Sequence, residues 1–216
     1  MSFTGWSTAN KVRLASGLIT ATPLTMACWV NPATIGIDQH LMGCYNSGVT
    51  GDLNQFSLGI GPSNKVQAKT GAGAATAFTE STAALTASAW HHACATFGSP
   101  TSRTAYLNGG NAATNTTSIT PTGINRATIG NRDSSTNDRS PAAGTLIAEA
   151  AIWNVVLDAA EIAALGAGIP PSLIRPQSLV AYLPLIRNLI DNKGNAFAIV
   201  GALSAADHCR IYGAVA

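Results

Sequence analysis

The residues most suited to chemistry are gathered in the stretch SAWHHACATF, where two histidines and a cysteine lie close together. Imidazole nitrogen and thiolate sulfur are preferred zinc ligands, but a structural zinc site needs four. The surrounding pattern predicts a β-strand, on which His91 and His92 point to opposite faces and only His92 and Cys94 could share an ion. The remaining candidate ligand pairs are His40 with Cys44, and His208 with Cys209. Neither spacing is diagnostic, so we expect a packed strand with one hydrogen-bonded histidine.

Carboxylates are too few for a glycoside hydrolase, which needs two of them flanking the scissile bond. The chain has three glutamates, Glu80, Glu149 and Glu161. In the strand-like segment LIAEAAIW, the position two residues after Glu149 is Ala151, so a second carboxylate on the same face is missing. We expect no enzymatic activity, and we expect Glu149 to accept hydrogen bonds from loop backbone or to pair with an arginine.

Short segments of alternating apolar and polar residues, separated by turn residues, predict an all-β protein. In LTMACWVN, for example, Leu24 and Met26 share one face with Cys28 and Val30. About a dozen such strands are expected, at the spacing of a sandwich or barrel. One short helix is expected near 158–165, because Asp158 followed by Glu161 resembles a capping box and alanine-rich residues follow.

Composition limits the partners. Charged residues make up 10% of the chain, against roughly 25% in an average soluble protein. The net charge of +2, with no basic run, argues against nucleic acid. No apolar run approaches the roughly 20 residues of a membrane-spanning helix, and no signal peptide is recognisable. We expect the four cysteines to be reduced and buried, and the weakly charged surface to favour association with other protein subunits.

Several ordered segments resemble the laminin-G-like, concanavalin-A-like lectin/glucanase jelly-roll superfamily. They are TMACWVNPATI, FSLGI, AWHHACATFGSPTSRTAYLNGG, ATIGNR and LIAEAAIWNVVLDAAEIAAL, which together span roughly residues 3–165. The segment from 178 to 209 resembles one that often opens such domains, with Leu183 where tryptophan is frequent. This arrangement resembles laminin-G-like proteins of tailed phages. The resemblance implies one domain, 1–216: an antiparallel two-sheet jelly-roll sandwich in which 178–212 returns as strands.

The resemblance also implies where ligands would bind. Members of this superfamily often bind calcium at a rim of the sandwich, through carboxylate, amide and carbonyl oxygens. The candidate calcium ligands lie in two oxygen-rich loops and are Asp52 and Asn54 in one, and Asn131, Asp133, Asn137 and Asp138 in the other. A sugar site would need exposed aromatic side chains. The candidates are Trp6, Tyr45 and Tyr106, whereas Trp29, Trp90 and Trp153 resemble core residues of the family.

Two functions remain open from the sequence. The first is a phage virion structural protein, made in the host cytoplasm and carried in the virion as a capsid decoration, cement or fibre-associated module. It would assemble as a homo-oligomer such as a trimer and bind other virion proteins such as a major capsid protein. The second is a carbohydrate-binding adhesin or lectin module of a phage tail or cell surface, with a surface glycan as its partner. No cofactor other than calcium is expected for either.

Overall fold

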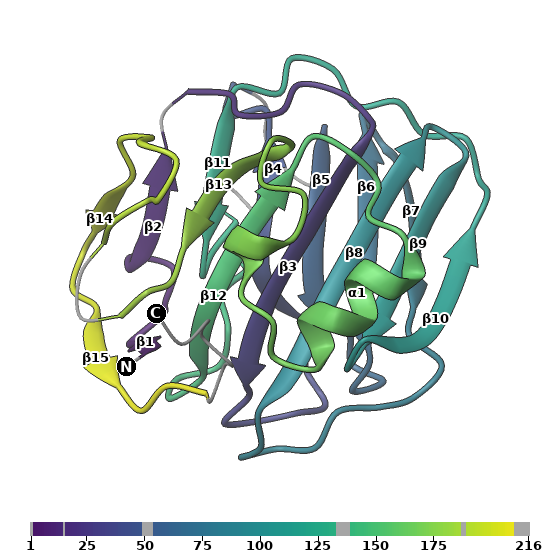
Figure 1. The fold of residues 1–216 in the computed structure, drawn as a ribbon. Helices are drawn as coiled ribbons and strands as arrows, with labels where there is room; N and C mark the ends of the chain where they lie inside the picture. The colour runs from purple at the N-terminus through teal and green to yellow at the C-terminus, as the bar shows by residue number, and fades with distance from the viewer. Residues whose placement is uncertain (1, 15, 49–53, 133–138, 187–188, 210–216) are drawn as a thin grey trace.

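The computed structural model describes residues 2–14, 16–48, 54–132, 139–186 and 189–209. Within these residues the strands form two antiparallel sheets that pack face to face, as the sequence predicts (Figure 1). Sheet A contains β10 (Gly110–Asn115), β9 (Ser102–Leu107), β8 (His91–Ser99), β3 (Leu24–Asn31), β12 (Leu146–Trp153), β1 (Ser2–Thr4) and β15 (Ser204–Ala206) in this order, with β13 (Leu179–Leu183) also paired to β12. Sheet B contains β14 (Ala198–Val200), β2 (Lys11–Leu14), β11 (Arg126–Ile129), β4 (Gln39–Tyr45), β5 (Gln55–Ile60), β6 (Val66–Ala72) and β7 (Ala75–Glu80).

The main core lies between the two sheets and is built by the side chains that alternate inward along each strand. On β3 the inward residues are Leu24, Met26, Cys28 and Val30, which is the face that the sequence pattern predicts. The inward side chains of β5 are Phe56, Leu58 and Ile60. The alternation with period two therefore sets both the sheet and the face that it buries.

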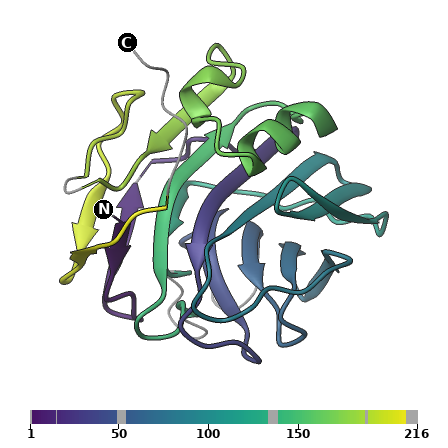
Figure 2. The same ribbon diagram turned by 60° about the horizontal axis from the view of Figure 1, so that its bottom comes forward.

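A second apolar cluster covers the outer face of sheet A. The helix α1 (Ala159–Gly166) lies across β8 and β10, where Ile162 and Leu165 pack against Trp153. Figure 2 shows the helix on the side of sheet A that faces away from sheet B. Its start is the predicted capping box: the Asp158 carboxylate accepts from the Glu161 backbone N–H at 2.9 Å, and Glu161 accepts from the Asp158 N–H at 2.8 Å.

The segment that follows α1 passes through the short 3₁₀ helix η1 (Pro171–Leu173) and then contributes strands to both sheets. β13 and β15 join sheet A, and β14 joins sheet B by pairing with β2. β15 also pairs with β1, so Ser2 lies opposite Ala206 and the first strand lies beside the last described strand. Among the described residues, none of the helices has the length and apolar character that crossing a membrane requires.

Candidate functional site

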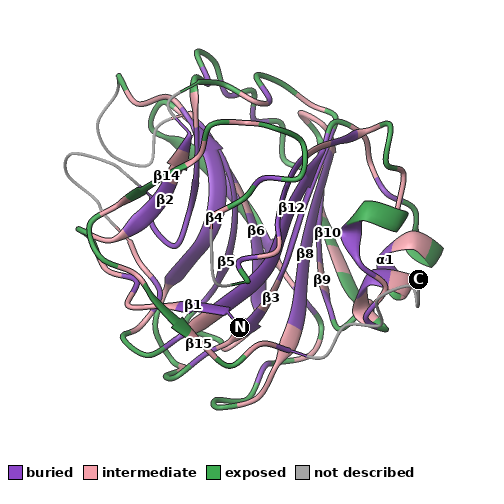
Figure 3. Cartoon of the chain, turned by 60° about the vertical axis from the view of Figure 1, so that its left-hand side comes forward, coloured by how far each residue is buried: buried purple, intermediate pink, exposed green. Residues whose placement is uncertain are grey.

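A small polar recess opens on the outer face of sheet B. We call it the sheet-B recess, and its lining residues are Asp38, Gln39, His40, Gln55, Ser57, Gly59, Gln67, Lys69, Arg132 and Arg139. Most of these side chains come from β4, β5 and β6. Figure 3 shows these strands buried along their lengths, although one of their faces points away from the core. The recess is therefore a polar surface that is largely screened from solvent.

The alternation that builds the core also places the recess side chains. On β5, Gln55, Ser57 and Gly59 point outward because their neighbours Phe56, Leu58 and Ile60 point inward. Cross-strand pairing then aligns β6 beside them, with Lys69 opposite Ser57 and Gln67 opposite Gly59. Residues that pair directly across antiparallel strands share a face of the sheet. Two strands thus contribute two amides, a hydroxyl and an ammonium group to one surface.

His40 is the histidine of the recess, and its side chain is almost completely buried, at 5% exposed. A register shift in β4 between His40 and Met42 interrupts the regular alternation there. Its ring lies over Gly43: a Cβ at that glycine would approach the imidazole carbon Cε1 to 2.9 Å. Burial, together with the nearby charges of Arg132 and Lys69, lowers the pKa of His40 to about 3. The imidazole is therefore neutral at physiological pH.

Nε2 of His40 and Nε2 of Gln55 are buried nitrogen atoms of the recess that have no hydrogen-bond partner in the described structure. Gln55 is 2% exposed, so its amide donor is removed from bulk water as well. On the neighbouring strand, by contrast, Gln67 donates through Nε2 to the Glu80 carboxylate at 3.4 Å. Buried polar atoms are nearly always hydrogen-bonded in folded proteins. The two atoms therefore mark a place where an acceptor oxygen, of a water or of a ligand, would be stabilised.

The loop that follows β11 brings two guanidinium groups to the recess. Gln39 anchors the far end of this loop, since its side-chain oxygen accepts from the Ala142 backbone N–H at 2.8 Å. The Arg132 backbone N–H donates to the Arg139 carbonyl oxygen at 3.0 Å, which closes the base of the loop. Arg139 also forms an ion pair with Asp38. These contacts place Arg132 and Arg139 over the end of β4, where His40 lies.

Phe78 on β7 provides an aromatic surface beside the recess. It pairs directly with Lys69 on β6, so the two side chains share the outer face of sheet B. Its side chain is 51% exposed, which is unusual for a phenylalanine in a strand. Sequence reasoning missed Phe78 because it lies in ATAFTE, a segment with no strong hydrophobic alternation. Its exposure could be recognised only once the pairing of β6 with β7 was known.

The aromatic residues predicted to contact sugar are placed differently. Trp6 is 2% exposed and Tyr45 is 4% exposed, so the expectation that they are accessible is wrong for both. The Trp6 ring packs over Gly130, where a Cβ would approach ring carbon Cε3 to 1.8 Å, and its N–H donates to the Phe3 carbonyl oxygen at 3.0 Å. Tyr106 is half-buried and packs against the second apolar cluster on sheet A. Tyr45 pairs directly with Gln55, so it lies on the outer face of sheet B, although it is buried and is not among the lining residues of the recess. Trp6 and Tyr106 are not among the lining residues either.

The predicted core tryptophans also need a correction. Trp153 is fully buried, and its indole N–H donates to the Ile174 carbonyl oxygen at 2.8 Å. Trp29 and Trp90 are only half-buried. Trp29 points to the outer face of sheet A, where its ring packs edge-on against His92 with centroids 5.6 Å apart. α1 covers other strands of this face, and so it does not bury Trp29.

The candidate calcium ligands lie at different places in the fold. Asp52, Asp133, Asn137 and Asp138 fall outside the described residues. The side-chain oxygen of Asn54 accepts from the Thr122 backbone N–H at 2.9 Å, so it already holds a loop. Asn131 is fully buried, and its amide donates to the carbonyl oxygens of Ser7 and Thr8. Calcium binding by these loops remains a prediction.

The histidines and cysteines of the opening stretch lie on two faces of β8. His91 is hydrogen-bonded to Thr86 and to Asn108, whereas His92 is buried and has its pKa lowered to about 4 by that burial. Cys94 packs in the second apolar cluster and is a free thiol. In the part of the chain that the structure describes, no three His, Cys, Asp or Glu side chains gather around a common point as a metal ion would require.

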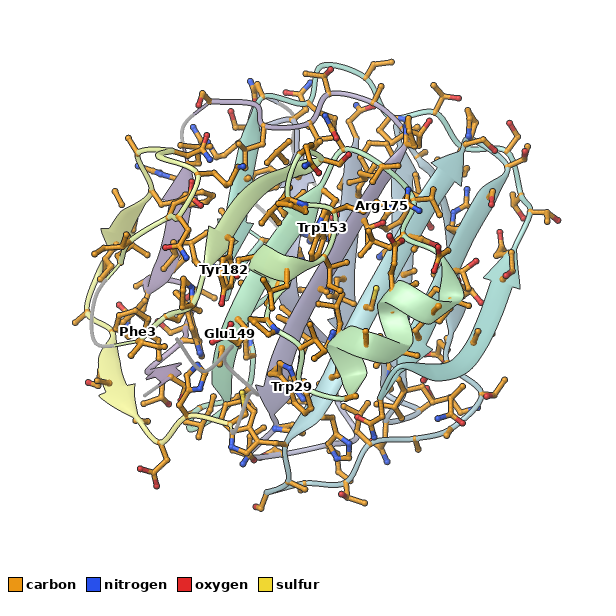
Figure 4. The ribbon with its side chains drawn as sticks, viewed as in Figure 1. Phe3, Trp29, Glu149, Trp153, Arg175 and Tyr182 are labelled. Carbon is orange, nitrogen blue, oxygen red and sulfur yellow. The ribbon has the colours of Figure 1, made fainter. Side chains whose placement is uncertain are left out.

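Glu149 is held by partners other than those expected. Its carboxylate accepts from the Tyr182 hydroxyl and forms an ion pair with His208 at 3.0 Å, so the expectation of loop backbone or an arginine is wrong. A bulge in β12, where Glu149 has φ of +54°, turns its side chain toward β13, and Figure 4 shows Glu149 and Tyr182 close together. Burial lowers the pKa of His208, but hydrogen bonds with Cys209 and Glu149 outweigh it and raise the pKa to about 10. The carboxylate is 1% exposed and serves to fix the C-terminal segment.

Comparison with solved structures places the fold among lectin-like sandwiches. A heptameric pentraxin from Limulus polyphemus aligns with a TM-score of 0.67 and 13% identity, covering 94% of this chain and 92% of the pentraxin chain. A proposed carbohydrate-binding protein from Bacteroides ovatus aligns with a TM-score of 0.65 and 16% identity, covering 96% of this chain and 61% of that one. The enzymatically active domain of tailspike protein 2 from bacteriophage CBA120 aligns with a TM-score of 0.55 and 14% identity, covering 82% of this chain and 28% of that one.

At these identities the structural likeness establishes the fold. No curated protein matches the sequence. A family model, described as the concanavalin A-like lectin/glucanases superfamily, matches residues 7–163, which is more than half of the chain. The match begins before β2 and ends inside α1, so it covers most of both sheets. The chain therefore belongs to the concanavalin A-like lectin/glucanases superfamily.

Proposed function

We propose that this chain is a non-catalytic carbohydrate-binding module whose binding site is the sheet-B recess together with Phe78. The observation that carries the proposal is the pair of buried, unpartnered nitrogens on His40 and Gln55. Sugars present many hydroxyl, carbonyl and ring oxygens, which can accept from an amide or an imidazole N–H. Binding would remove the cost of leaving these two atoms without a partner.

Phe78 supplies the apolar part of such a site. Ligand sites combine an apolar or aromatic surface with a small number of placed polar groups. The half-exposed ring of Phe78 next to Lys69 can pack against the apolar face of a sugar, while the amides and the imidazole contact its oxygens. The likeness to the B. ovatus protein, proposed to bind carbohydrate, adds support from a related fold.

The proposal of a non-catalytic role rests on the placement of carboxylates. Glycosidases need an acid and a second carboxylate on facing positions. Among the described lining residues of the recess, Asp38 is the only acid, and it is paired with Arg139. Glu149 is buried on the other sheet beside Tyr182 and His208. The residues that would hydrolyse a glycosidic bond are therefore not assembled in the described recess.

A glycan array followed by isothermal titration calorimetry tests the proposal. The whole chain should bind at least one glycan, and Phe78→Ala should weaken that binding about tenfold because it removes the apolar contact at an exposed position. Ile199→Ala is the matched control, since Ile199 is also an exposed strand residue of sheet B, on β14 at the other edge. An array without any bound glycan, or equal losses from both variants, would argue against a site at the recess.

A virion structural role is the second candidate, and we keep it for two observations. The surface carries little charge, which lowers the desolvation cost of protein–protein contact. The fold is also similar to a domain of a phage tailspike. In this role the chain would form a homo-oligomer such as a trimer and contact other virion proteins such as a major capsid protein. Light scattering on the purified chain and co-sedimentation with phage particles test this role. A chain that stays monomeric and does not sediment with the particles would contradict it.

A further inference from the structure

We infer that the sugar recognised by the sheet-B recess is acidic, and that its carboxylate contacts the side chains of Gln55 and His40 beside Lys69 and Arg132. This inference rests on the proposed function and adds the chemical class of the ligand. It extends to length: the acidic sugar belongs to an oligosaccharide of at least two units, the second of which contacts Phe78.

The unpartnered atoms of the recess are hydrogen-bond donors. The unpartnered Gln55 atom is an amide nitrogen, which can donate but cannot accept. Nε2 of His40 can donate in one tautomer of the neutral ring. A ligand that complements this pair has to bring acceptor oxygens. A carboxylate is an acceptor-only group with two oxygens, and its hydrogen bonds are stronger than those of a neutral hydroxyl.

The charged side chains around the recess also favour an anionic ligand. Lys69 and Arg132 lie close enough to His40 to oppose its protonation, which means that their positive potential reaches the unpartnered atoms. The described lining includes the cationic side chains Lys69, Arg132 and Arg139, the last of which is paired with Asp38. Lys69 is itself desolvated, and burial lowers its pKa. Cations in a partly enclosed recess act on a ligand charge more strongly than they would in bulk water.

The spacing determines the length of the ligand. Phe78 on β7 is separated from Gln55 on β5 by the intervening strand β6. Neighbouring strands lie about 4.8 Å apart, so the backbones of β5 and β7 are roughly 10 Å apart across the sheet. Phe78 also lies two residues along β7 from Thr76, the residue level with Gln55, which adds to the separation. That distance exceeds one hexose ring. One sugar therefore cannot reach both groups, whereas a disaccharide can place its carboxylate at Gln55 and its second ring on Phe78.

The test compares acidic oligosaccharides with their carboxyl methyl esters, which keep the sugar and remove the charge. Disaccharides and trisaccharides containing glucuronic, galacturonic or N-acetylneuraminic acid serve as probes in titration calorimetry. We expect at least one acid to bind tenfold or more tightly than its ester, a difference of about 1.4 kcal/mol. Lys69→Gln should reduce that preference severalfold. Lys193→Gln is the control, because it makes the same charge change at an exposed site, where Nζ donates to the Pro176 carbonyl oxygen. This variant should leave the preference for the acid unchanged.

The outcomes separate the two proposals. One outcome is that neutral glycans bind, that Phe78→Ala weakens their binding, and that acidic glycans bind no more tightly than neutral ones. In that case the recess is a sugar site but the inference about charge is wrong. If no glycan of either kind binds, both proposals fail. Salt dependence gives a second measurement that does not depend on a variant folding. Raising the salt from 50 to 500 mM should weaken binding of the acidic sugar and leave binding of its neutral ester nearly unchanged. Equal salt dependence of the two affinities would overturn the inference.

Discussion

Replacement of Gln55 by methionine should make the free protein more stable while it removes ligand binding. The Gln55 amide nitrogen is buried without a hydrogen-bond partner, so the folded state carries a desolvated donor that the unfolded chain exposes to water. Methionine has a similar length and no polar atom, so Gln55→Met removes this cost and keeps most of the packing. A gain in stability is unusual for a change in a strand, and it distinguishes a ligand-binding residue from a structural one.

The size of the effect follows from the cost of an unsatisfied buried group, which is about 1–3 kcal/mol. Glutamine and methionine lose similar side-chain entropy on burial, so this term cancels between the parent and the variant. At the lower end of the range, the free energy of unfolding should rise by about 1 kcal/mol. For a chain of this length that corresponds to an increase in Tm of about 2–4 °C. Gln67→Met is the matched control on the next strand. Since the Gln67 amide does have a partner, in Glu80, this variant should gain nothing or lose up to about 1 kcal/mol.

Urea unfolding followed by tryptophan fluorescence, with calorimetric melting as a second probe, measures both variants against the parent chain. The same samples are then titrated with the best glycan from the array. We expect Gln55→Met to be the more stable variant and to bind at least tenfold more weakly than the parent. If Gln55→Met is less stable than Gln67→Met, then the Gln55 amide is satisfied in the folded protein and the reasoning that identifies the site is refuted.

Three further predictions follow from the same structure. Gly43→Ala should cost about 1–3 kcal/mol of stability in urea unfolding, because the added Cβ would approach the Phe56 carbonyl oxygen to 2.8 Å and the His40 ring carbon Cε1 to 2.9 Å. Displacement of the His40 ring should also weaken glycan binding, and an unchanged affinity would mean that His40 takes no part in binding. The raised pKa of His208 stabilises the fold fully below about pH 6.5, and this contribution should be lost as the pH rises toward 10; unfolding measured across this range should show the decline, and His208→Gln should abolish it. Asp158→Ala should cost about 1 kcal/mol through loss of the helix cap, whereas Asp158→Asn should lose much less; equal losses in thermal melts would show that the cap hydrogen bond is not the cause.

The sandwich and the helix could be predicted because their signals are local. On β3, the alternation of Leu24 and Met26 with Thr25 and Ala27 sets the buried face without knowledge of the rest of the chain. The capping box needs only two residues three positions apart, and the structure confirms it. Both features follow from the geometry of one strand or one turn of helix, which neighbouring residues determine.

The recess could not be predicted because it depends on contacts between distant segments. Gln55 and Lys69 have the pattern of an ordinary solvated strand face, and their enclosure requires the loop that Gln39 anchors 103 residues away in sequence. Trp6 was expected to be exposed for the same reason. Its burial depends on Gly130, whose missing side chain leaves room for the indole ring. Local pattern gives the direction of a side chain, while tertiary contacts determine whether solvent reaches it.

Two-dimensional NMR of the labelled protein tests whether the outer face of sheet B binds a sugar. An acidic disaccharide from the array is titrated into the chain while the Gln55 side-chain amide, the His40 ring and the Phe78 ring are followed. These three signals should shift together and saturate with the affinity measured by calorimetry. Shifts confined to the half-buried Trp29 and Trp90 on the sheet-A side, with the sheet-B signals unmoved, would contradict this expectation.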